Sequence, residues 1–290
     1  SACGLVGLKP TRGRISPGPY GIESAGLAIN GVLTRDVRDT AAALDVLAHP
    51  WPGDLYVLPE PQGSFLHACQ RPPGRLRIGV LTTPVIDADA QVDPVCLEAV
   101  ERTAALLTEL GHDVEPAPVP FEPERWSSFE AMWSVLALSA PISSEVEDRL
   151  VPLTRWLRDK GRSVTGIEYA LAMNSMQVTT REAAATWAPY DVILTPTLAR
   201  PPALIGELRN DGDPAADFAA QMAYTPWTSA WNLTGWPAIN LPLHWAEVEG
   251  ATLPIGVMLG GRHGAEETLL SLAAQLEEAR PWRHRHPPVW

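Results

Sequence analysis

Two short segments contain side chains of the kinds that bind metal ions. Residues 87–89 (Asp-Ala-Asp) resemble the start of a calcium-binding loop, but position 92 is valine where the turn of such a loop requires glycine. His284 and His286 are of the type that binds zinc, but they lie in a proline-containing segment without a further histidine or cysteine nearby. We therefore expect no metal site and no cofactor.

A nucleophilic serine needs a base and a turn that exposes its hydroxyl. Residues 21–26 place Ser24 between two glycines, but one residue too many separates it from the first for a G-x-S-x-G elbow. The basic segment 9–14 lacks the spacing of a phosphate-binding loop, and none of the seven histidines stands in a context that marks a base. Composition and spacing alone identify no catalytic constellation in these 290 residues.

The opening of the chain carries the most specific motif. Residues 3–14 read CGLVGLKPTRGR, which is similar to the second half of the signature of the amidase signature family, C-G-x-x-G-L-K-P-T-x-G-R. Further segments resemble landmarks of the same family in the same order, with Met258 in place of its usual glutamine. They are GVLTRDVRD at 31–39, DVILTPT at 191–197, NLTGWPAINLP at 232–242 and PIGVMLG at 254–260.

The resemblance implies an amidase that hydrolyses a carboxylic amide C–N bond through a Ser–cis-Ser–Lys triad and an acyl-enzyme. A buried, neutral lysine acts as the base through the bridging serine. The nucleophile belongs to the first half of the signature, about six residues before Ser1 if the motif runs on as usual. We therefore expect the triad upstream of Ser1 and assign no catalytic residue in this chain. Lys9 and Lys160, its only lysines, are expected to be structural.

The resemblance also implies where the acyl group of a substrate would bind. Family members build that pocket from two segments, here 126–138 and 226–232, in which Glu130 is the only charged residue. The candidate binding residues are Met132, Trp133, Leu136, Trp227, Thr228 and Trp231. Aromatic walls suit a neutral, largely apolar amide of the aryl, aliphatic or nylon-oligomer type. The alternative interpretation is that these side chains belong to the hydrophobic core.

Two other functions remain open. One is an amidotransferase subunit of the same family, acting on aminoacyl-tRNA with a partner subunit. The other is a catalytically inactive structural relative or a fragment. We expect the chain to be the C-terminal portion of an amidase, inactive by itself.

Charge and hydropathy limit the partners. The net charge is −12, from 22 basic and 34 acidic residues, which disfavours nucleic-acid binding. No apolar run is long enough for a membrane span, no signal peptide is recognised, and the three cysteines form no C-x-x-C pair. We expect a cytoplasmic protein whose partner is a small-molecule amide, with no nucleic acid and no membrane. A homodimer and an N-terminal companion segment of the same protein are the further partners considered.

The elements that must position these segments follow from hydrophobic periodicity. We expect one α/β domain over residues 1–290, with the family's mixed, twisted β-sheet sandwiched between α-helices and lacking its N-terminal part. Residues 49–73 are expected to be a connecting loop, and 197–224 a polar loop with one short helix. The predicted strands are 76–81, 112–119, 190–196, 238–243 and 255–259. The predicted helices are 34–47, 93–111, 124–138, 145–160, 165–187 and 266–279.

Overall fold

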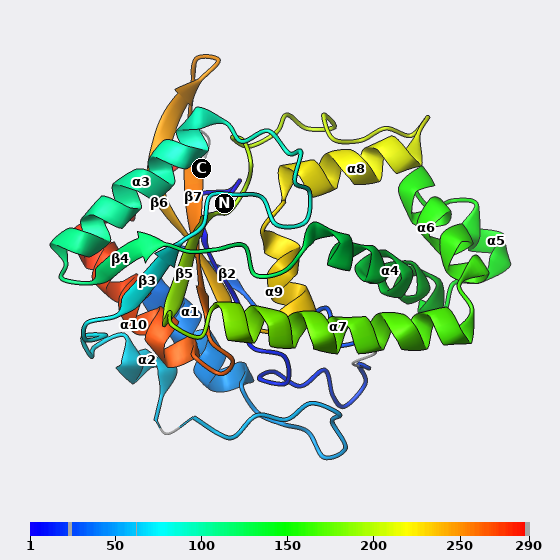
Figure 1. Ribbon diagram of the computed structural model, residues 1–290, viewed down its shortest axis with the longest axis horizontal. Helices are drawn as coiled ribbons and strands as arrows, with labels where there is room; N and C mark the ends of the chain where they lie inside the picture. The colour runs from blue at the N-terminus through cyan, green and yellow to red at the C-terminus, as the bar shows by residue number, and fades with distance from the viewer. Residues whose placement is uncertain (23–24, 62, 288–290) are drawn as a thin grey trace.

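A mixed β-sheet forms the centre of the computed structural model, which describes residues 1–22, 25–61 and 63–287 (Figure 1). Within these residues the strand order is β2-β1-β6-β7-β5-β3-β4. β3 pairs in parallel with β4 and β5, and the other neighbours are antiparallel. The strands are β1 (Val6–Lys9), β2 (Leu33–Thr34), β3 (Arg77–Val80), β4 (Asp113–Pro116), β5 (Val192–Pro196), β6 (Ala238–Val248) and β7 (Ala251–Gly261).

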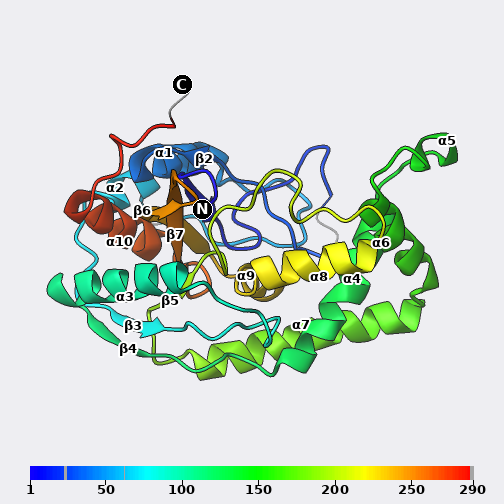
Figure 2. The same cartoon turned by 90° about the horizontal axis from the view of Figure 1, so that it is seen from above.

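Helices cover both faces of the sheet (Figure 2). α1 (Val37–Leu47), α2 (Phe65–Ala68), α3 (Pro94–Glu109) and α10 (Glu266–Ala279) contribute to the core on one face. α4 (Ser127–Ser139), α7 (Gly166–Thr186) and α9 (Thr228–Thr234) contribute to the core on the other. The remaining helical segments are the 3-10 turn η1 (Pro123–Trp126), α5 (Ser144–Glu147), α6 (Pro152–Ser163) and α8 (Pro214–Tyr224).

The strands divide their side chains between these two cores. In β5, Val192 and Leu194 join the core beneath α3 and α10, whereas Ile193 joins the core beneath α7 and α9. In β7, Val257 joins the core beneath α3 and α10, and Met258 joins the core beneath α7 and α9. Successive residues of a strand point to opposite faces, so a sheet covered on both sides needs apolar residues at consecutive positions. The α/β class predicted from the sequence is confirmed.

Local signals predicted several elements correctly. The strand–helix–strand unit forms with β3 and β4 parallel, and Asp93 caps α3 by accepting the Val95 N–H at 2.9 Å. α7 begins where the helix 165–187 was predicted to begin, at a capping box formed by Thr165 and Glu168. These elements form where predicted because capping depends on residues close in sequence.

The helix expected over 145–160 is wrong in its bounds. The structure has two helices there, α5 and α6, because Pro152 begins a new helix at its first position. Gly161 lies inside α6, although a helix end was expected there. A Cβ at Gly161 would lie 2.4 Å from the carbonyl oxygen of Ser134 in α4, so this glycine permits close packing of the two helices.

Other departures arise from short-range turn chemistry. The loop expected at 49–73 contains α2, whose first turn is capped by the Ser64 hydroxyl. β6 and β7 extend beyond the predicted strands into one long hairpin. Glu249 and Gly250 at its tip both have positive φ, 50° and 83°, as a type I′ turn requires.

The opening motif connects the sheet to helices on both faces. The Glu266 carboxylate at the start of α10 is fully buried and accepts the Thr11 N–H at 2.8 Å and the Arg14 guanidinium at 3.3 Å. Arg12 donates to the carbonyls of Asn232 and Leu233 at the end of α9, at 2.8 and 3.0 Å. Burial alone raises the pKa of Glu266, but Arg14 and Thr11 hold that pKa below its usual value.

Replacing Glu266 by alanine is expected to lower the free energy of unfolding by about 3–5 kcal/mol, because Arg14 would remain buried without its counter-charge. Glu267→Ala is the matched control. Glu267 pairs with Arg71 at a site where the two side chains are 33% and 51% exposed. Its loss should cost no more than about 1 kcal/mol. Urea unfolding of both variants measures the difference, and equal costs would contradict a dominant role for the buried pair.

His244 on β6 predicts an acid-sensitive fold. Its ring lies against Thr103 of α3, with 2.9 Å between Nε2 and Oγ1. Burial, aided by Arg280 and Arg102, lowers the pKa of His244 from 6.5 to about 3. The folded-state pKa lies below the unfolded one, so the stabilisation is complete above pH 6.5 and is lost as the pH falls toward 3.

The measurement is urea unfolding of wild type and His244→Gln between pH 7.5 and about pH 4.5, within the titration window of the unfolded histidine. We expect the wild type to lose stability more steeply over this range, because each unit of pKa difference is worth about 1.4 kcal/mol. Parallel pH dependences of the two proteins would show that His244 does not titrate as described.

Candidate functional site

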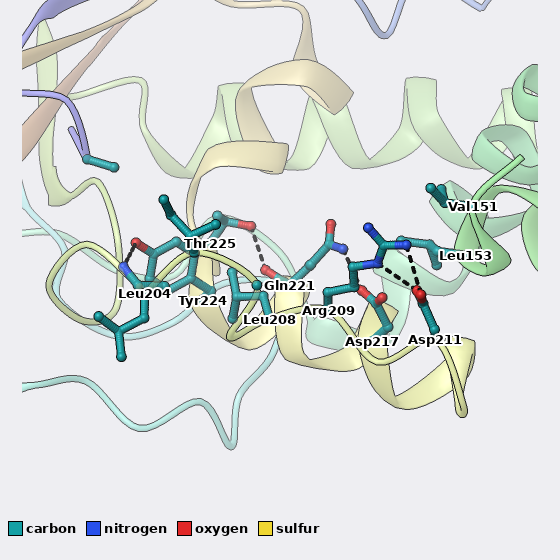
Figure 3. A pocket seen from close by; sticks show the side chains of 14 residues that line it. Val151, Leu153, Leu204, Leu208, Arg209, Asp211, Asp217, Gln221, Tyr224 and Thr225 are labelled. Carbon is teal, nitrogen blue, oxygen red and sulfur yellow. Dashed lines mark hydrogen bonds and ion pairs between the residues drawn. The ribbon is translucent and has the colours of Figure 1, made fainter.

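The residues that follow the expected nucleophile motif lie at the edge of a cavity. Ser1 packs against β6 and β7, and its Oγ accepts the Gly256 N–H at 3.1 Å. Ala2 lines a cavity of about 670 Å³ formed mainly by α8 and the loop before it, which we name the α8 cavity (Figure 3). Ala2 thus places the start of the opening motif at the wall of this cavity.

The α8 cavity has apolar walls and internally paired charges. Arg209 binds Asp211 with two hydrogen bonds of 2.7 and 2.8 Å, as the dashed lines in Figure 3 show. Asp217 is buried and accepts the Gln221 side-chain N–H at 2.6 Å. The apolar lining consists of Ala2, Val151, Leu153, Ala203, Leu204, Ile205 and Leu208, with the ring of Tyr224. These walls favour a neutral ligand over a strongly charged one.

A second, smaller cavity of about 260 Å³ lies beside the ends of α7 and β7, and we name it the tryptophan cavity. Trp187, Trp231 and Trp236 line it, with Trp187 and Trp231 stacked at 5.3 Å between ring centroids. The Trp231 indole covers Gly260 so closely that a Cβ there would lie 1.9 Å from the ring. Because Gly260 has no side chain, the Trp231 indole can lie directly against the backbone of β7.

The six residues predicted to bind substrate are only partly gathered. Trp227, Trp231, Met132 and Leu136 join one apolar cluster, and the first three are buried. Trp133 lies outside this cluster and is 36% exposed, although it stacks on Phe129.

Only Trp231 of the six lines either cavity. Trp227 donates its indole N–H to the Thr83 carbonyl at 2.9 Å, which matches the alternative interpretation as core. Thr228 donates to the carbonyl of Thr225, a residue of the α8 cavity, at 3.2 Å. A role in binding stays a prediction for all six.

Sequence reasoning missed most of the cavity lining. Gln221 and Tyr224 lie on α8, inside the segment expected to be mainly polar loop. Trp187 is the last residue of the predicted helix 165–187 and Trp236 lies in the family segment 232–242, but neither was predicted to line a pocket. The abundance of tryptophan, 11 residues, was a signal, but spacing along the chain does not show which indoles meet across the fold.

Neither lysine resembles a base for a serine. Burial, together with Arg12, lowers the pKa of Lys9 to about 7, while Glu266 opposes the shift. Its ammonium nevertheless donates to the Pro10 carbonyl at 2.8 Å, and Lys160 pairs with Glu130. In the described part of the chain, neither ammonium donates to a serine hydroxyl. Structural roles therefore fit both lysines.

Ser24, in the imperfect elbow, lies outside the described residues. Residues 1–22, 25–61 and 63–287 contain no group of three or more His, Cys, Asp or Glu side chains that could hold a metal ion. The same residues contain no helix with the length and apolar character needed to cross a membrane.

Gly260→Ala is expected to destabilise the fold by about 1–3 kcal/mol, because the new methyl group overlaps the Trp231 indole. Gly166→Ala, where nothing lies within 4 Å of an added Cβ, is the control. It should change stability by less than about 0.5 kcal/mol. The double variant with Trp231→Ala removes the overlap, so denaturant unfolding should show non-additive effects. Full additivity would contradict the contact.

Comparisons with known proteins agree with these features. The profile of the Amidase family matches residues 1–270. The chain is 36% identical to the 6-aminohexanoate-cyclic-dimer hydrolase of Paenarthrobacter ureafaciens over 312 residues, covering 100% of this chain and 62% of that protein. It is 37% identical to the putative amidase AmiC of Mycobacterium tuberculosis, covering 99% of this chain and 60% of that protein. The chain thus spans about three fifths of these relatives.

The fold is shared as well. A solved structure of 6-aminohexanoate cyclic dimer hydrolase in complex with substrate superposes with a TM-score of 0.89 at 32% identity, covering 99% of this chain and 63% of that one. A bacterial aryl acylamidase of the amidase signature enzymes superposes with a TM-score of 0.72 at 20% identity, covering 98% of this chain and 61% of that one, which supports the fold alone. Motifs, sheet and matches agree that the chain belongs to the amidase signature family of hydrolases acting on C–N bonds.

Proposed function

We propose that the protein containing this chain hydrolyses a neutral, largely apolar carboxylic amide through a Ser–cis-Ser–Lys acyl-enzyme mechanism. The observation that carries the proposal is the position of Ala2 in the wall of the α8 cavity. The family signature places the nucleophile about six residues before Ser1, a reach of no more than about 20 Å for an extended chain. A substrate in this cavity would therefore lie within reach of the segment that carries the serine.

The charge distribution supports a neutral substrate. Arg209 in the α8 cavity is neutralised by Asp211, and the Asp217 carboxylate also accepts the Asn210 backbone N–H at 3.0 Å. Because these charges are already paired, an ionic substrate group would lose its hydration against the apolar walls without gaining a free counter-charge among these residues. The similarity to a hydrolase named for a cyclic dimer of 6-aminohexanoate supports the same class, of which a nylon-oligomer amide is one member.

This chain would supply binding walls, whereas the reacting groups would come from the preceding segment. Trp231 and its neighbours in the tryptophan cavity present flat apolar surface. The tryptophan cavity shares no lining residue with the α8 cavity, so it would be a second, separate binding surface for an apolar part of the substrate. Trp231 is the strongest of the six predicted binding residues, because it combines burial with a place in a cavity wall.

The test uses the full-length protein, in which this chain follows the segment with the serine motif. An uncharged aryl amide and its carboxylate-bearing analogue are compared. We expect kcat/KM to favour the neutral amide by about 10-fold or more, equivalent to about 1.4 kcal/mol. Trp231→Ala should raise KM by about 10-fold with a smaller effect on kcat, because it removes apolar binding surface. Trp51→Ala, at a half-exposed position in neither cavity lining, is the control.

A serine-directed sulfonyl fluoride supplies the second measurement. One covalent adduct by intact mass, with parallel loss of hydrolysis, is expected for the acyl-enzyme mechanism. Preference for charged amides would contradict the proposed substrate class. Absence of both labelling and hydrolysis would indicate an inactive relative, and activity only with a partner subunit would indicate an amidotransferase.

A further inference from the structure

A β-bulge occurs where Ser1 meets the sheet. Leu241 pairs with Val257 and His244 pairs with Ile255, so two residues of β6 oppose Gly256 alone. A bulge takes a backbone group out of the regular ladder and makes it available for another partner. Here the Gly256 N–H points to the Ser1 hydroxyl, which accepts it at 3.1 Å.

Gly256 has no space for a side chain. A Cβ at this position would lie 2.2 Å from Oδ1 of Asn240 and 2.6 Å from Oγ of Ser1, well inside van der Waals contact. The backbone at Gly256 is not in the positive-φ region, so close approach explains the glycine here. This residue brings the strand and the opening segment into direct contact.

Asn240 and Thr197 add two more contacts to the one at Gly256. We name these three residues the anchor of the opening segment. Thr197 donates its hydroxyl to Oδ1 of Asn240 at 2.6 Å, and Asn240 donates its Nδ2 to the Leu5 carbonyl at 2.9 Å. The donor from Thr197 fixes the amide orientation, because only Nδ2 remains to face the carbonyl. Both side chains are less than a tenth exposed, so water offers little competition for these bonds.

We infer that Thr197, Asn240 and Gly256 position residues 1–5, and through them the upstream segment that carries the nucleophile. The inference rests on the proposed function for its catalytic consequence, but the anchoring can be measured separately. These three would be positioning residues, because they contact the segment and not the reacting atoms. A displacement of about 1 Å at a reacting group can cost about 100-fold in rate, so this anchor would set kcat more than KM.

Thr197→Val in the full-length protein is the principal variant, because it keeps the shape of the side chain and removes the donor to Asn240. We expect faster hydrogen exchange in a peptide covering residues 1–8. We also expect the rate of sulfonyl fluoride labelling and kcat to fall by about 10-fold or more, with KM changing less than about 2-fold. Thr197→Ser keeps the hydroxyl, so its hydrogen exchange, labelling rate and kcat should be close to those of the wild type.

Thr195→Val is the matched control. Thr195 is buried in β5, two residues before Thr197, but its hydroxyl donates locally to the Pro196 carbonyl at 2.7 Å. It should leave exchange in residues 1–8 and the labelling rate unchanged. Ser1→Ala is a second test, because it removes the hydroxyl that accepts the Gly256 N–H. Ser1 is not fully buried, so this variant should fold even if Thr197→Val does not.

Unchanged exchange in residues 1–8 for both Thr197→Val and Ser1→Ala would overturn the inference. Faster exchange with wild-type labelling and kcat in an active protein would also overturn it. A wild-type protein that neither hydrolyses amides nor reacts with the sulfonyl fluoride would overturn the proposed function. In that case exchange in residues 1–8 still decides whether the anchor holds the segment.

Discussion

The buried contact of Arg14 with Glu266 is the interaction on which the arrangement of this chain depends. It joins the opening motif to the first residue of α10, at a place where neither charge reaches water. A carboxylate at a helix N-terminus is also stabilised by the helix dipole, which reduces the cost of its burial. With α10 held there, β6 and β7 are covered on this face by one of the helices that form its core.

The same motif organises the opposite face through Arg12. Its guanidinium binds carbonyls at the end of α9, where Gly235 has a φ of 74° and closes the helix. α9 carries Trp231, and the residues just before it reach the α8 cavity. The opening motif thus links α9, which carries Trp231, to α10, because its two arginines act on opposite sides of the sheet.

Glycine determines how closely the layers approach. Gly161 lets α6 cross α4, Gly260 accommodates the Trp231 indole, and Gly256 admits Ser1 and Asn240. At each place a methyl group would meet a backbone atom, a rigid ring or a buried amide, none of which yields cheaply. The contact at Gly260 borders the tryptophan cavity, and the contact at Gly256 borders residues 1–5. The close packing of the layers therefore also shapes the candidate site.

Local signals in the sequence were enough to predict the helices at 93–111 and 165–187 and the strands at 76–81 and 112–119, which are α3, α7, β3 and β4, and the ordered motifs were enough to predict the family. Turn geometry and helix breaks were harder, as Pro152 and the β6–β7 hairpin show. Of the six predicted binding residues, only Trp231 lines either of the two cavities described above. The contacts of Trp187 with Trp231 and of Thr197 with Asn240 became visible only in the folded chain. The physical reason is that periodicity and capping depend on neighbours in the chain, whereas a cavity or an anchor depends on which distant faces come into contact.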